Sequence, residues 1–227
     1  MKRLLLLSLL LAPRAEAYSI VWGPMVDSWC YSQAWGGGMW GSRTETDEGP
    51  TRSDADSYYD YGYGRGQSEA RITQADTWGY GSDSDLPAAG GYWSRAEIGR
   101  SFRVVGGSGG VDVSLTGWTS QEAWSFHFLD ATAGWSFGVD GVSEIGESWE
   151  PDHSVWSDHA WEWTGSLEYG RAYVARGVTW SGVSGGSGFS SLRLDAPTEA
   201  QPVPEPASLL LLGLGLVPLL RRRMRRC

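Results

Sequence analysis

Apolar and polar residues alternate with a period of two in short runs through the middle of the chain, and glycine and serine separate the runs. In 111–116, Val111, Val113 and Leu115 fall on one side of an extended strand, with polar residues between them. Comparable runs occupy 124–129, 135–139, 159–167, 172–180 and 188–194. Helical periodicity is almost absent, so the pattern predicts an all-β fold, an antiparallel β-sandwich of jelly-roll type. A β-solenoid is the alternative, but no fixed repeat period supports it.

Two segments, 94–116 and 36–90, depart from the simple pattern of short separate strands. The alternating run 94–105 leads through a glycine-rich turn into 111–116, so the two runs predict a β-hairpin. Residues 36–90 are rich in Gly, Ser, Asp and Tyr, a composition that also permits disorder. The tyrosines within 59–63 alternate with other residues, and 70–78 alternates too. We therefore predict strands joined by long loops in this region.

The N-terminus has the pattern of a secretory signal peptide. A basic start precedes an apolar run, and Ala15 and Ala17 have the small-residue spacing of a cleavage site. We therefore assign 1–17 to a signal peptide and 18–194 to the β-body. Residues 195–203 combine Ala, Pro, Thr, Glu and Gln without apolar spacing, which is typical of a linker.

The C-terminus joins a proline-containing triplet, an apolar segment and a basic end. Pro204, Glu205 and Pro206 precede 207–220, which carries no charge and is mostly leucine. At about 1.5 Å of helical rise per residue this segment reaches roughly 21 Å, less than the ~30 Å of a bilayer core. It therefore predicts a short transmembrane helix that anchors the chain transiently. The basic end, 221–226, holds the C-terminus in the cytoplasm by the positive-inside rule. Its positive charges are Arg221, Arg222, Arg223, Arg225 and Arg226.

This tail, 204–227, resembles the PEP-CTERM sorting signal of Gram-negative bacteria, in which a Pro-Glu-Pro triplet precedes a membrane segment and an arginine cluster. In that family a membrane-embedded exosortase is thought to recognise the tail, remove it and pass the protein to the cell surface. The resemblance implies an exported protein, transiently anchored in the inner membrane, with exosortase as a transient partner. It also implies a cell-surface or extracellular destination within exopolysaccharide-rich biofilm. The alternative is an ordinary single-pass tail anchor.

The net charge limits which partners the chain can bind, and the cysteine count limits which disulfides it can form. Without its first 17 residues and its arginine tail, the chain keeps 10 of its 18 basic and 26 of its 27 acidic residues. Residues 18–206 therefore carry a formal net charge of −16, which repels nucleic acid and anionic lipid. Cys30 and Cys227 are the two cysteines, and Cys227 would leave with the tail. No intrachain disulfide is expected, and Cys30 is interpreted as a small buried residue, with a nucleophile or an intermolecular bridge as alternatives.

Side chains able to do chemistry are present but form no recognisable catalytic set. Glu147 and Glu150 would suit a glycosidase acid and base, but carboxylates are common throughout this acidic chain. His153 and His159 lack the spacing of a helical zinc motif. We therefore predict a non-enzymatic protein without catalytic residues, metal site or cofactor. A secreted hydrolase is the weakest of the functional hypotheses.

Tryptophan is the feature of the composition that points to binding. All 14 tryptophans lie within the β-body, and indole faces stack on apolar surfaces such as those of sugar rings. Trp161 and Trp163 are two residues apart in a predicted strand, so they share one face and form a candidate glycan platform. One alternative is that both fill the core of a chain short of Leu and Ile, since alternate tryptophans in a sandwich usually point inward, and another is that they form a protein interface. The leading hypothesis is a non-enzymatic surface or matrix protein, and a carbohydrate-binding module is the alternative.

Overall fold

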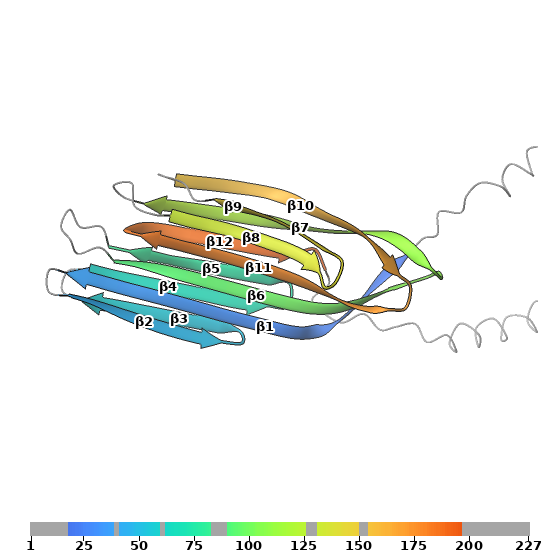
Figure 1. Ribbon diagram of the computed structural model, residues 1–227, viewed down its shortest axis with the longest axis horizontal. Coiled ribbons are helices and arrows are strands. Elements are labelled where there is room, and N and C mark those ends of the chain that lie inside the picture. Colours follow the sequence, from blue (N-terminus) through green and yellow to red (C-terminus); the bar gives the residue numbers. More distant parts are fainter. Residues whose placement is uncertain are drawn as a thin grey trace, which may run out of the picture.

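Two antiparallel sheets of six strands each pack face to face in the computed structural model, which describes residues 18–38, 41–59, 62–82, 90–125, 131–149 and 154–196. The strands run along the long axis of the molecule (Figure 1). Sheet A contains, in spatial order, β2 (Gly41–Gly49), β1 (Ser19–Gly38), β6 (Gly90–Val105), β11 (Ala172–Ser184), β8 (Ala131–Val139) and β9 (Ser143–Trp149). Sheet B contains β10 (Ser154–Glu168), β7 (Gly110–Ser125), β12 (Gly186–Leu194), β5 (Gln74–Gly81), β4 (Gly62–Arg71) and β3 (Arg52–Tyr59). The predicted all-β antiparallel sandwich is confirmed, and its jelly-roll connectivity stays a prediction.

The hairpin predicted within 94–116 is wrong. β6 lies in sheet A and β7 lies in sheet B, so the turn between them carries the chain from one sheet to the other. In this turn Gly106 and Gly109 have φ angles of 114° and 83°, which glycine adopts without a Cβ clash. The predicted inner face of the second strand is confirmed, because Val113 and Leu115 are buried. Alternation determines which side of a strand faces the core, but it does not determine which sheet the strand joins.

Within 36–90, the described residues between 41 and 81 form the strands β2 to β5 and short turns between them. The single strand predicted through the tyrosines is wrong, because Tyr59 of β3 and Gly62 of β4 are directly opposite each other in an antiparallel pair. Asp60 and Tyr61 lie outside the described residues. The order present in the described part comes from pairing with neighbouring strands, which composition does not report.

The single strand predicted over 70–78 is two strands. β4 ends at Arg71 and β5 begins at Gln74, and the two strands pair antiparallel around a two-residue turn. That turn consists of Ile72 and Thr73. Neither residue is among the glycine, asparagine, aspartate and proline residues that mark turns, so the sequence carries no turn signal here.

The interior between the sheets has two halves of different chemistry. One half is aromatic, and the ring centroids of Phe137 and Trp161 lie 4.3 Å apart there. The other half contains buried hydroxyl groups that bond one another across the sheets. The Oγ atom of Ser53 is 2.7 Å from the Oγ atoms of both Ser32 and Ser68, so these buried polar groups are satisfied internally.

Glycine allows the sheets to approach closely in this second half. A Cβ atom built on Gly64 of sheet B would lie 2.0 Å from the carbonyl oxygen of Gly91 in sheet A. No larger residue fits at such a distance, because real Cβ contacts are never so short. The interior therefore requires glycine, alanine and serine here, which accounts for part of the 32 glycines in the chain.

Tryptophan rings lie on glycines of the adjacent strand. The directly opposed pairs are Trp35 with Gly91, Trp93 with Gly182, Trp180 with Gly134 and, on the inner face of sheet B, Trp161 with Gly117. A Cβ atom on Gly134 would meet Cζ2 of Trp180 at 2.4 Å, so the ring occupies the space that a side chain would need. Such pairing of aromatic residues with strand glycines fixes register and covers exposed backbone.

The predicted signal peptide (1–17), most of the linker and the sorting tail (204–227) lie outside the described residues. In the part of the chain that the structure describes, no helix is long and apolar enough to cross a membrane. The last described strand, β12, ends at Leu194.

Candidate binding surface and sorting signal

The candidate glycan platform at Trp161 and Trp163 is wrong, because both side chains face the interior of the sandwich. Their exposed fractions are 5% and 0%. The indole N–H of Trp163 donates to the Ser143 carbonyl oxygen at 3.1 Å, which satisfies it inside the core. Glu162 and Glu168, both exposed, lie in the opposite phase of β10 and are the sequence signal that places the two tryptophans inward.

Exposed tryptophans gather instead on the outer face of sheet B. Trp118 and Trp124 of β7 are 46% and 43% exposed, and Trp156 of β10 is 80% exposed. The phase of β7 explains this, because Val113 and Leu115 point inward and residues at even positions therefore point outward. Extending that phase along β7 would have found the two exposed tryptophans from the sequence.

Trp124 and Trp156 flank a shallow hollow of about 400 Å³. Glu122, Ala123 and Ser154 complete its lining. The strand register makes a checkerboard of aromatic and polar side chains here, because Ser154 is opposite Trp124 and Trp156 is opposite Glu122. The hollow therefore offers two indole surfaces, one carboxylate and one hydroxyl group to a ligand.

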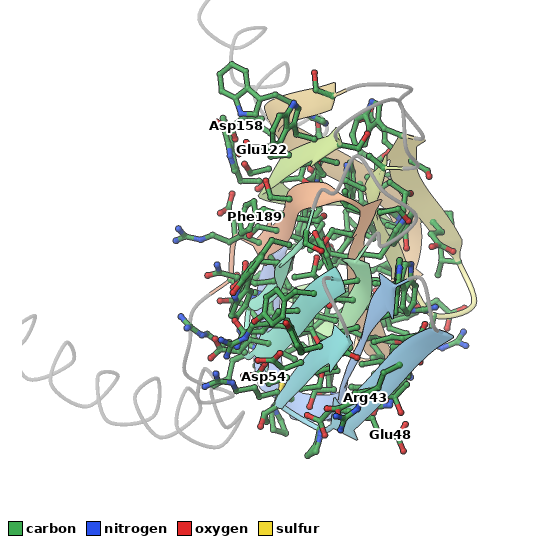
Figure 2. All side chains as sticks on the ribbon, turned by 90° about the vertical axis from the view of Figure 1, so that its left-hand side faces the viewer. Arg43, Glu48, Asp54, Glu122, Asp158 and Phe189 are labelled. Carbon is green, nitrogen blue, oxygen red and sulfur yellow. The ribbon has the colours of Figure 1, made fainter. Side chains whose placement is uncertain are left out.

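A hydrogen bond across β7 and β10 fixes a second carboxylate on this face. The indole N–H of Trp118 donates to Oδ1 of Asp158. Figure 2 shows Asp158, Glu122 and Phe189 together along one side of the molecule, with Asp54 further along the same side. These residues come from four different strands, so the face extends across the full width of sheet B.

On the other half of the same face, over β3 to β5, the polar side chains form ion pairs and hydrogen bonds with one another. Asp54 of β3 accepts from Arg65 at 2.9 Å and from Gln67 at 2.6 Å. Burial alone would raise the pKa of Asp54, but these two hydrogen bonds and the charge of Arg65 hold the pKa below its ordinary value. Asp76 accepts from the Ser191 hydroxyl at 2.6 Å. Polar groups of this half are therefore already engaged within the protein.

A second hollow, of about 540 Å³, lies on sheet A, and Arg176 on its wall is paired in the same way. Arg176 on its wall contacts three carboxylates: Asp140 at 2.9 Å, Asp27 at 3.0 Å and Glu97 at 3.2 Å. These carboxylates neutralise the guanidinium of Arg176. This hollow therefore offers a ligand fewer available polar groups than the hollow between Trp124 and Trp156.

The other chemical candidates do not assemble into a reactive site among the described residues. Cys30 is buried, and that burial raises the pKa of its thiol to about 11, so the reactive thiolate is disfavoured. Nε2 of His159 lies 3.5 Å from Oε2 of Glu147. The other two candidates, Glu150 and His153, lie outside the described residues. Over the described part of the chain, no group of three or more His, Cys, Asp and Glu residues could hold a metal ion.

The described residues thus define a two-sheet antiparallel β-sandwich with an aromatic and acidic outer face. Beyond them, residues 202–226 match the family model of the PEP-CTERM protein-sorting motif. The chain therefore carries a PEP-CTERM sorting signal, which implies an exported protein sorted through exosortase. The match covers the tail and says nothing of the β-body.

Comparisons of the whole chain add nothing to this conclusion. No curated protein matches it. One solved structure, the functional form of the mosquito-larvicidal Cry4Aa toxin from Bacillus thuringiensis, is similar at 5% sequence identity and a TM-score of 0.15. The alignment covers 77% of this chain and 44% of the toxin chain. A likeness this slight carries no argument about fold or function.

Proposed function

We propose that this chain is a non-enzymatic protein that exosortase releases to the cell surface or the extracellular matrix, where the β-body associates with exopolysaccharide. The observation that carries the proposal is the sorting motif at 202–226, placed after the last described strand of a folded β-body. An exported domain followed by a removable anchor is the order that surface delivery requires.

The proposed route has three steps. The signal peptide, 1–17, directs export and is cleaved after Ala17. The apolar segment 207–220 and the arginines that follow it then hold the chain in the inner membrane. Exosortase acts as a transient partner at the Pro-Glu-Pro triplet, 204–206, and frees the β-body.

Replacing the triplet tests this route. The variant in which Pro204, Glu205 and Pro206 all become alanine should stay in the inner membrane with its tail attached, whereas the unaltered chain should reach the surface or the medium. Glu199→Ala, five residues before the triplet, is the control and should behave as the unaltered chain does. Fractionation of the native host with detection of the β-body measures both. Equal release of the triplet variant would refute the route.

The association with exopolysaccharide is proposed from the outer face of sheet B. Three exposed tryptophans and an acidic hollow on one face suit sugar rings, which present apolar faces and many hydroxyl groups. Incubating the full chain with exopolysaccharide from its host should give binding without cleavage of the polymer. Absence of binding would remove this part of the proposal, and release of new reducing ends would favour the secreted-hydrolase hypothesis instead.

A further inference from the structure

We propose that the exposed aromatic half of the outer face of sheet B binds a neutral polysaccharide whose chain runs across the strands. This inference rests on the proposed association with exopolysaccharide and specifies its ligand and its direction. The binding row is defined as Trp156, Glu122, Phe189 and Trp78, which follow one another on β10, β7, β12 and β5.

Strand register brings these four residues into one line. Trp156 is directly opposite Glu122, Glu122 is opposite Phe189, and Phe189 is opposite Trp78. Neighbouring strands lie about 4.8 Å apart, so the row presents aromatic side chains at intervals of roughly 5 to 10 Å. Trp124, diagonal to Trp156, widens the row on one side at the hollow.

A ligand that followed the strands instead would meet aromatic surface much less often. Along β7, the outward tryptophans are Trp118 and Trp124, six residues apart. At about 3.4 Å per residue they are separated by roughly 20 Å, with Ser120 and Glu122 between them. Trp156 of β10, opposite Glu122, lies between them in register, so the rings along these two strands are spaced more widely and less evenly than the rings across the strands.

Charge selects a neutral polymer. The strands β7 and β10 contain no arginine or lysine but carry Asp112, Glu122, Asp158, Glu162 and Glu168. β12 adds one cation, the exposed Arg193 opposite Trp118, so carboxylates outnumber arginines five to one on these three strands. These carboxylates repel the acidic groups of uronic-acid polymers and of nucleic acid. Ionised carboxylates accept hydrogen bonds and cannot donate them, which suits the hydroxyl groups of a neutral sugar.

The far half of the face limits the length of the site. The row ends beyond Trp78, whose indole N–H donates to Gln67. Nε2 of Gln67 in turn donates to Oδ2 of Asp54 at 2.6 Å, and the same carboxylate accepts a hydrogen bond from Arg65. Because these polar groups bond one another, the row ends at Trp78, and the exposed rings beyond it, Tyr80 and Tyr58, lie outside the row.

The test uses the full chain, purified in mild detergent, and exopolysaccharide from its own host separated by anion exchange into a neutral and an acidic pool. We expect binding to the neutral pool. Trp156→Ala and Phe189→Ala should each weaken it at least fivefold. Trp29→Ala, which removes a 36% exposed tryptophan from sheet A, is the matched control and should change it less than twofold. Circular dichroism checks that each variant is folded.

Each other outcome has a distinct meaning. Binding to the acidic pool alone would overturn the inference. Binding that neither Trp156→Ala nor Phe189→Ala weakens would also overturn it. The proposed association with exopolysaccharide would stand in both cases. Stronger dependence on Trp118 than on Phe189 would show a ligand along β7 and also overturn it. Binding that disappears after protease treatment of the pool would identify a protein partner and refute both proposals. No binding to either pool would refute the proposed association itself.

Discussion

Trp163→Ala tests whether this tryptophan belongs to the core or to a binding platform. The side chain is fully buried, and removing such a large side chain costs about 3–5 kcal/mol in the free energy of unfolding. The Ser143 carbonyl oxygen would also lose its indole donor, which adds about 1 kcal/mol. Domains of this kind have a free energy of unfolding of about 5–15 kcal/mol, so a loss of about 4–6 kcal/mol removes a large fraction of the stability.

Urea denaturation of the full chain, followed by circular dichroism, measures this difference. Trp156→Ala is the matched control, because its side chain is 80% exposed and its loss should change the free energy of unfolding by less than about 0.5 kcal/mol. The reasoning would be refuted if Trp163→Ala lost less than 1 kcal/mol, or if the two variants were equally destabilised.

Three further predictions concern the scaffold. Gly134→Ala should lower the free energy of unfolding by about 1–3 kcal/mol, because its Cβ would meet the ring of Trp180 at 2.4 Å; an unchanged urea midpoint would contradict the packing described. The pKa of Asp54 is lower in the folded chain than in the unfolded chain, so its stabilising effect is complete above about pH 4 and is lost as pH falls through the folded pKa. Asp54→Asn should therefore reduce the acid-induced loss of stability in pH-dependent urea melts, and an identical pH profile would count against the interaction with Arg65. Cys30 should resist iodoacetamide at pH 8 in the folded chain and react in urea, because burial raises its pKa to about 11. Rapid alkylation without urea would show that the thiol is accessible.

Alternation in the sequence predicted the strands and several inner faces, because burial on one side of a sheet imposes a period of two. Val113 and Leu115 are buried as that period requires. The same period could not assign β6 and β7 to different sheets, since a strand satisfies its inner face equally well on either side of the sandwich. The turn at Ile72 was missed because neighbouring strands, and no special turn residue, determine where the chain reverses.

The glycan platform was wrong in its residues, and binding through tryptophan stays a prediction. Tryptophan indicated stacking, yet Trp161 and Trp163 share the inward phase of β10, and the exposed rings are those of Trp118, Trp124 and Trp156. The row across sheet B joins residues that are far apart in the sequence, such as Glu122 and Phe189. Only the register of paired strands brings them together, and no spacing within one segment encodes it.

The sorting tail was readable from the sequence because its parts are contiguous. The triplet at 204–206, the apolar segment at 207–220 and the arginines after it stand in a fixed order, and the family match at 202–226 agrees with that interpretation. A signal made of adjacent residues depends little on tertiary structure, whereas a binding face depends on it entirely.

The most direct test of the account is the intact mass of the protein recovered from its own host, with the membrane and the medium measured separately. The proposed sorting route predicts a form that begins at Tyr18, ends within 204–206 and lies outside the inner membrane. A form that keeps Arg221 to Cys227 and stays in the inner membrane would contradict it and make this chain a permanently anchored protein.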